Sequence, residues 1–328
     1  MSDVLHGDAL TILRERLGDE SVQCCVTSPP YWGLRDYGVE GQLGLDKTPE
    51  AYVVKLVEVF REVRRVLKAD GTLWLNLGDS YAGSGQGWMK DGTVAGGPKQ
   101  KTNLGSVQRI ADTVGFDKPR NYISSRQDNG LKPKDLVGIP WRVAFALQAD
   151  GWYLRSDIIW HKPNPMPESV TDRPTKAHEY LFLLSKNERY YYDAEAIAEP
   201  VLNPNDVTRP ITSAHPDDGT VLGRASSPHC GLLTNKCKTN GMRNKRTVWT
   251  VATQPYPDAH FATFPPKLIE PCILAGCPIS GMVLDPFAGS GTTLAVAQQL
   301  GRQAIGIELN AAYLPLIEQR LRQAVLPL

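Results

Sequence analysis

The chain has 328 residues, of which 41% are hydrophobic and 22% are charged, and its formal net charge at pH 7 is +1. A chain of this length forms one large α/β domain with insertions, or two smaller domains. No apolar run is long enough to span a bilayer, and residues 1–8 lack the basic and apolar regions of a secretory signal, so we expect a cytoplasmic protein. The nearly balanced charge excludes attraction of a polyanion by the whole chain, so any nucleic-acid contact must come from local basic clusters.

The first eighty residues predict a parallel sheet. Gln23 to Thr27 is a short buried strand that ends at Ser28 and two prolines, because proline cannot continue a central strand. Residues 49–67 have apolar side chains at helical spacing, and we expect Asp70-Gly71 to close that helix. Residues 72–77 then form a strand. A strand, a helix and a second strand in this order are typical of a βαβ unit.

Two polar stretches interrupt the pattern. Gly83 to Lys134 is rich in glycine, serine, glutamine and basic residues, and loops of this length are usually functional or disordered. Residues 200–250 are also polar and contain prolines, with basic residues near their end. Between the two stretches we expect a helix at Pro140 to Ala149 and strands at residues 153–160 and 180–185.

The C-terminal part is regular. Its pattern predicts a helix, a strand, a helix, a strand and a helix, at residues 266–274, 282–284, 292–300, 304–307 and 311–325.

The six cysteines show no paired CxxC spacing, so we expect reduced thiols. His215, His229, Cys230 and Cys237 are the alternative, a zinc site. Structural zinc sites usually have tighter paired spacing, and we therefore predict no metal.

A glycine turn near the C-terminus predicts a ligand site. Asp285 ends a strand, Gly289 and Gly291 follow at once, and the next helix begins near Thr292. Glycine lets the backbone approach a ligand closely, and free N–H groups at a helix start favour an anionic group. Glu308 ends the following strand, where an acid is well placed to accept hydrogen bonds from a ribose diol.

Three ligands compete for this turn. The phosphate-binding P-loop needs a lysine that this turn lacks, and the dinucleotide fingerprint needs a glycine where Leu294 stands. S-adenosylmethionine remains. A turn with purely structural glycines is the alternative.

The Ser28-Pro29-Pro30-Tyr31 segment suits chemistry on a base amine. The exocyclic amine of cytosine or adenine is a poor nucleophile, because its lone pair is delocalised into the ring. The Ser28 hydroxyl and the Pro29 carbonyl are two acceptors that favour a pyramidal nitrogen, and Tyr31 provides a ring on which a flipped base stacks. The alternative is a proline turn with a surface tyrosine.

Taken in this order, the two motifs resemble those of the β-class DNA amino-methyltransferases of restriction–modification systems and phages. In that class the catalytic motif comes first and the cofactor motif last, and Ser28, Pro29, Pro30 and Tyr31 match the catalytic motif. The resemblance implies that S-adenosylmethionine is bound by Asp8, Asp285, Phe287, Gly289, Ser290, Gly291, Thr292, Glu308, His260, Thr263 and Phe264.

The resemblance also implies an α/β fold, a doubly wound, mostly parallel Rossmann-like methyltransferase sheet with insertions. Residues 1–199 and 251–328 would form the catalytic domain, with a mobile basic insertion at about 83–134, and residues 200–250 the target-recognition region. Its expected partners are double-stranded DNA and a cognate restriction endonuclease, in a monomer or homodimer that works at the nucleoid of a bacterial or phage-infected cell. The expected DNA contacts come from Arg243, Lys245, Arg246, Lys132 and Lys134.

Serine in the first motif position favours cytosine N4 as the methylated atom, with adenine N6 as the alternative. Cytosine C5 methylation needs a cysteine nucleophile, and Tyr31 follows the prolines instead. Two further alternatives are a nucleic-acid-binding protein with a degenerate methyltransferase fold, and a methyltransferase that acts on RNA or on protein glutamine.

Overall fold

The computed structural model describes residues 2–34, 37–82, 131–132, 134–201, 241–254 and 264–325. The chain divides into two compact units, one made of residues 1–192 and 247–328 and the other of residues 193–246. The first unit contains an eight-stranded sheet flanked by helices. None of the described helices has the length and hydropathy to cross a membrane.

The strands of the large sheet are β1 (Ser2–His6), β2 (Val22–Thr27), β3 (Leu67–Leu77), β4 (Tyr153–His161), β5 (His178–Ser185), β8 (Val248–Thr250), β9 (Met282–Asp285) and β10 (Gln303–Glu308). Its helices are α1 (Ala9–Arg16), α2 (Pro49–Val66), α5 (Ile139–Ala149), α6 (Pro266–Gly276), α7 (Thr292–Gln299), the 3-10 turn η4 (Ala311–Tyr313) and α8 (Leu314–Val325).

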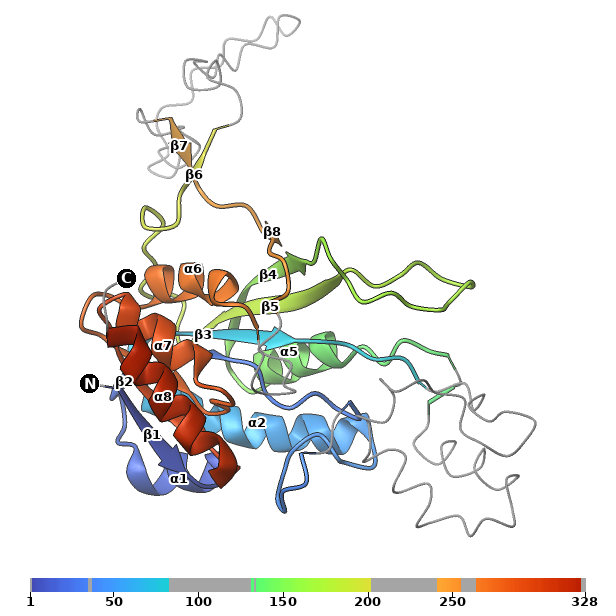
Figure 1. The fold of residues 1–328 in the computed structure, drawn as a ribbon, viewed down its shortest axis with the longest axis horizontal. Coiled ribbons are helices and arrows are strands. Elements are labelled where there is room, and N and C mark those ends of the chain that lie inside the picture. Colours follow the sequence, from blue (N-terminus) through green and yellow to red (C-terminus); the bar gives the residue numbers. More distant parts are fainter. Residues whose placement is uncertain are drawn as a thin grey trace, which may run out of the picture. The chain divides into compact units, whose positions relative to one another are not determined.

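The strand order is β1-β10-β9-β2-β3-β5-β4-β8, and only β5 runs antiparallel to its neighbours. This confirms the predicted doubly wound, mostly parallel fold. From β9 the chain winds outward through α7 to β10, and from β2 it winds the other way through α2 to β3 (Figure 1). The order therefore reverses between β9 and β2, and ligands bind at such switch points, beyond the carboxyl ends of the strands.

Both faces of the sheet are covered by helices, which explains why β2 is buried at every position. Helices α1, α2 and α5 pack beside one another on one face, and α6, α7 and α8 form the other layer (Figure 1). Helix α2 begins where Thr48 accepts a hydrogen bond from the Ala51 N–H, with Pro49 in the first turn, the combination expected at a helix start.

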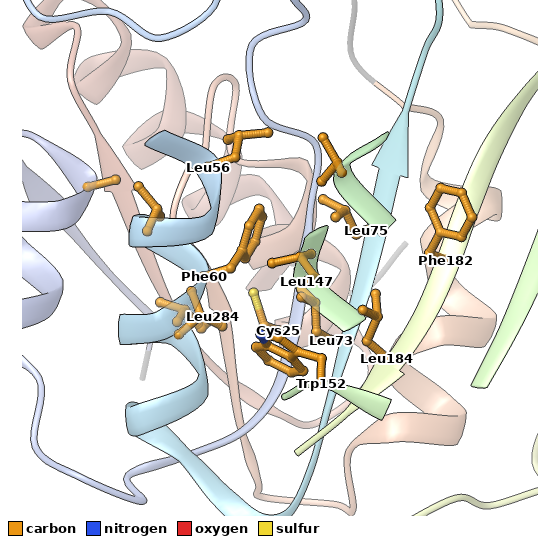
Figure 2. Close-up of a cluster of buried hydrophobic side chains, with 14 of the residues drawn as sticks. Cys25, Leu56, Phe60, Leu73, Leu75, Leu147, Trp152, Phe182, Leu184 and Leu284 are labelled. Carbon is orange, nitrogen blue, oxygen red and sulfur yellow. The ribbon is translucent and has the colours of Figure 1, made fainter. Parts of the chain in front are cut away.

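Successive residues of the central strands point to opposite helical layers, as the two-residue period of a strand requires. Cys25 and Leu73 join the cluster formed with α2 and α5, which also contains Phe60 and Leu147 (Figure 2). Cys24 and its neighbours on β3 face α6 instead, so closely that a side chain at Gly276 would lie 2.8 Å from the Cys24 sulfur.

The predicted turn at Asp70-Gly71 is wrong, because both residues lie inside β3. The pairing with β2 jumps from Val22↔Leu67 to Cys24↔Thr72, so the extra residues form an irregularity within one strand. Backbone carbonyls there find other partners: Asp70 accepts from the Tyr191 N–H and Gly71 from the Lys186 N–H. The turn signal thus marks a bulge.

The described part of the second unit contains a short two-stranded sheet. Strand β6 (Glu199–Pro200) pairs antiparallel with β7 (Met242–Arg243). Most of the predicted insertion at 83–134 lies outside the described residues. Its two ends meet in the first unit, where Tyr81 forms an antiparallel bridge with Leu136.

Candidate active site

One pocket opens at the switch point between β9 and β2. It encloses about 970 Å³ of empty space, part of which is open to solvent. Its lining includes Asp8, Ser28, Pro30, Phe264, Asp285, Phe287, Gly289, Ser290, Thr292 and Glu308. Residues from both predicted motifs therefore share one cavity, although they are more than 250 positions apart in the chain.

Asp285 connects the Ser28 side of this pocket with the glycine turn. One carboxylate oxygen accepts from the Thr27 hydroxyl at 2.6 Å and the other from the Thr293 hydroxyl at 2.6 Å, while the Phe287 N–H donates at 3.1 Å. The residue is 2% exposed, and burial raises its pKa from 3.8 to about 6, although these three donors pull it down.

Glu308 holds the glycine turn. Its two carboxylate oxygens accept from the Gly289 N–H and the Asn310 N–H, each at 2.8 Å. Burial raises the pKa of this carboxyl above its ordinary value, against the effect of these two donors. Gly291, at φ +76°, forms the left-handed N-cap of α7, a conformation that other residues rarely adopt.

Asp8 lies at the start of α1 and lines the same pocket. One of its oxygens accepts from both the backbone N–H and the hydroxyl of Thr11, each at 2.9 Å. The backbone N–H of Gly7 donates to the Glu308 carbonyl at 3.0 Å, which fixes the end of β1 beside β10. The prediction that Asp8 binds the cofactor came only from the family resemblance.

The Ser28-Pro29-Pro30-Tyr31 segment turns away from β2 at the pocket wall. Ser28 and Pro30 line the cavity, while Pro29 is buried. The Tyr31 hydroxyl lies 3.3 Å from the Ser28 hydroxyl, and the Tyr52 hydroxyl of α2 donates to the Pro30 carbonyl at 2.8 Å. Tyr31 contacts Ser28 but is not among the residues that line the pocket.

Several lining residues were not predicted. The loop at residues 37–43 contributes Tyr37, Val39, Gln42 and Leu43, and the segment after β10 contributes Asn310 and Tyr313. The glycine-rich composition of residues 33–44 was a signal for a loop near a ligand. Arg320 of α8 gave no such signal, and it donates to the Thr292 hydroxyl at 2.8 Å and the Ser290 hydroxyl at 3.0 Å.

Two predicted cofactor residues, His260 and Thr263, lie outside the described residues, as do the four residues of the possible zinc site. Elsewhere, within the described ranges, no three His, Cys, Asp or Glu side chains lie close enough to hold a metal ion. Cys24, Cys25, Cys272 and Cys277 are buried, reduced thiols.

Several of the residues predicted to contact DNA pair with carboxylates. Arg243 and Arg246 bind Glu199 at 3.0 and 2.5 Å. In the other unit, Lys132 and Lys134 bind acidic residues at 3.2 and 2.7 Å. These pairs reduce the local positive charge that a phosphate would meet.

The pocket suits a cationic ligand. Asp285 and Glu308 are both buried, and among the described residues neither forms an ion pair. Buried carboxylates without a cationic partner are costly, and a ligand with positive charge reduces that cost. S-adenosylmethionine has a sulfonium and an ammonium group as well as a ribose, so the residues of this pocket fit it.

A doubly wound sheet with an acid-lined pocket at its switch point is the architecture of a Rossmann-like methyltransferase. Residues 22–319 match the N6_N4_Mtase family model, described as DNA methylase. The chain belongs to this family, whose cofactor is S-adenosylmethionine, as the sequence predicted.

Two relatives are similar over nearly their whole length. The type II methyltransferase M.Cfr9I of Citrobacter freundii is 47% identical, with 97% of this chain and 87% of that protein covered. The type II methyltransferase M.SmaI of Serratia marcescens is 45% identical, with 97% and 90% covered.

Solved structures share the fold at lower identity. The putative DNA modification methylase TTHA0409 of Thermus thermophilus, solved with S-adenosylmethionine, superposes with a TM-score of 0.58 at 22% identity, covering 100% of this chain and 96% of that one. The PvuII DNA methyltransferase (cytosine-N4-specific) gives 0.54 at 20% identity, covering 97% and 86%.

Proposed function

We propose that this protein transfers a methyl group from S-adenosylmethionine to the exocyclic N4 of cytosine in duplex DNA, after flipping the base out of the helix. The observation on which this proposal rests is that Ser28 lines the same pocket as Asp285 and Glu308. An acceptor for the base amine and the acids suited to the cofactor thus meet at one cavity.

The residues of the pocket have separate proposed roles, and the first is to bind the cofactor. Bound S-adenosylmethionine supplies the electrophilic methyl group. We assign its binding to Asp8, Asp285, Glu308 and the turn from Gly289 to Thr292, with Phe264 and Phe287 as apolar walls. Glu308 already binds two backbone N–H groups, and each of its oxygens keeps a lone pair for a ribose hydroxyl.

Ser28 acts on the base. An amine hydrogen that donates to the Ser28 oxygen draws the nitrogen towards a pyramidal geometry and directs its lone pair at the methyl group. Positioning and electrostatics supply the acceleration, since the nitrogen attacks directly and needs no covalent enzyme intermediate. We assign the stacking of the flipped base to the aromatic ring of Tyr31.

The relatives support a biological setting for this activity. Because proteins 45–47% identical to this chain are type II methyltransferases, we infer that it protects a specific DNA site against a cognate restriction endonuclease. We assign target recognition to residues 200–250 and expect a monomer or homodimer that works at the bacterial nucleoid. Lys132, Lys134, Arg243, Lys245 and Arg246 are the proposed phosphate contacts.

Sequencing of DNA from expressing cells tests the proposal. The gene is expressed in a host without DNA methylation, and detection separates N4-methylcytosine from N6-methyladenine. We expect N4-methylcytosine at one short sequence, and a strongly reduced mark with the Ser28→Ala control. N6-methyladenine at one short sequence would establish the alternative base, and unmodified DNA would refute methyl transfer to DNA.

A further inference from the structure

A chain of hydrogen bonds runs behind Ser28, away from the pocket. The Ser28 hydroxyl lies 3.3 Å from the Tyr31 hydroxyl, which lies 2.8 Å from Glu179 Oε2 and 3.0 Å from Asn76 Oδ1. Glu179 belongs to β5 and Asn76 to β3, and these strands are neighbours in the sheet. None of the functions assigned above uses Glu179.

The partners of Tyr31 are acceptors. Asn76 uses its amide nitrogen as a donor, to the Tyr180 carbonyl at 3.0 Å and to Glu179 Oε2 at 3.3 Å, so its oxygen is the atom that faces Tyr31. Glu179 Oε1 forms an ion pair with Lys162, and an ionised carboxylate only accepts hydrogen bonds.

This arrangement fixes the direction in which the series of hydrogen bonds donates. A phenol has one proton, and here both nearby acceptors compete for it. Burial, and then the charge of Glu179, raise the pKa of Tyr31 well above its ordinary value, so the phenol keeps its proton. Its oxygen is left with lone pairs only, and the hydroxyl of Ser28 donates to it.

The direction matters for the reaction. A serine hydroxyl that is free to rotate presents either its proton or its lone pairs to the pocket. Once its proton points at Tyr31, only lone pairs face the place where the amine donates. A proton aimed at the amine would instead compete for the nitrogen lone pair that must attack the methyl group.

We propose that Glu179 is a positioning residue that, through the Tyr31 hydroxyl and together with Asn76, fixes the Ser28 hydroxyl as a hydrogen-bond acceptor for the base amine. The proposal rests on the proposed role of Ser28 and goes beyond it, because it gives the Tyr31 hydroxyl a function separate from its ring. It applies equally to an amine on cytosine or on adenine.

A double-mutant cycle between Tyr31→Phe and Ser28→Ala tests the proposal in the full-length enzyme. Single-turnover methyl transfer is measured with saturating S-adenosylmethionine and duplex DNA that contains the recognition sequence. Tyr31→Phe keeps the ring and removes the hydroxyl, and we expect it to slow transfer about tenfold, the size of one lost hydrogen bond. In the Ser28→Ala background the same change should alter the rate less than about twofold, because no hydroxyl remains to orient.

Two binding measurements separate positioning from support of the fold. The dissociation constants for cofactor and for DNA should stay close to those of the wild type in Tyr31→Phe. If the loss instead persists in the Ser28→Ala background, or appears in either dissociation constant, the hydroxyl only supports the structure of the site and the proposal is wrong.

Glu179→Gln provides the second variant. Lys162 binds the amide oxygen, so the amide nitrogen faces Tyr31 and donates to it, while Asn76 remains as the acceptor. We therefore expect a smaller loss than in Tyr31→Phe, and no further loss when the two changes are combined. A larger loss in Glu179→Gln would show that Glu179 does not act through Tyr31.

The wild-type measurement separates this proposal from the proposed function. If the wild-type enzyme transfers no methyl group to DNA, the proposed function fails before any variant is compared. If it does so and the cycle is additive, only the role of the Tyr31–Glu179 chain fails.

Discussion

Asp285 should make the protein less stable as the pH rises. Its carboxyl is buried, and its pKa rises from 3.8 to about 6 in the folded protein. The native state therefore holds a proton more tightly than the unfolded chain does. The contribution of Asp285 to the free energy of unfolding is therefore highest below pH 3.8 and falls until the pH passes about 6.

The size of this loss of stability follows from the difference between the two pKa values of Asp285. A difference of about 2 pKa units, at about 1.4 kcal/mol per unit, corresponds to about 3 kcal/mol. Roughly 2 kcal/mol of this lies between about pH 4.5 and 7.5. Asp285→Asn keeps the shape of the side chain and cannot ionise, so the variant should gain about 2 kcal/mol relative to the wild type across this interval.

Urea denaturation of the cofactor-free protein at a series of pH values measures this difference. Asp172→Asn is the control, because Asp172 is exposed and its hydrogen bond to Lys134 lowers its pKa. The control should change in the opposite direction, losing stability relative to the wild type as the pH rises. If the difference between Asp285→Asn and the wild type stays constant within about 0.5 kcal/mol, burial does not dominate the ionisation of Asp285.

Glu308→Gln should weaken cofactor binding about 10- to 100-fold in calorimetry, because an amide can accept from only one of the two backbone N–H groups and has no charge; unchanged affinity would remove Glu308 from the cofactor site. Gly78→Ala should slow methyl transfer at least about tenfold with cofactor affinity unchanged, since the added methyl group would lie 2.4 Å from Tyr31 Cε2; full activity would mean that the ring position is unimportant. Lys245→Ala should lower DNA affinity and reduce the salt slope by about one, and an unaltered slope would place this lysine away from phosphate.

The local parts of the site could be predicted from the sequence. The turn from Asp285 to Gly291 needs only a strand end, two glycines and a helix start, and all three are encoded within eight consecutive residues. The same holds for Ser28, which follows a buried strand directly. Their meeting in one pocket followed from the rule that ligands bind where the strand order reverses.

The remaining parts depend on long-range packing. Glu179 is 148 positions from Tyr31 and lies on β5, which runs antiparallel to its neighbours in the large sheet, so no spacing in the sequence relates the two. Arg320 likewise reaches the glycine turn because α8 packs on α7. Asp70-Gly71 has the composition of a turn, but pairing with β2 on one side draws the segment into the sheet as a bulge.

The hydrogen bond between Thr27 and Asp285 spans 258 positions of the chain. During synthesis on the ribosome, β2 and α2 are made long before β9, α7 and β10. The nascent chain therefore has the Ser28 segment before it has the glycine turn to which we assign the methyl donor. With that assignment, methyl transfer can begin only after translation has passed Glu308.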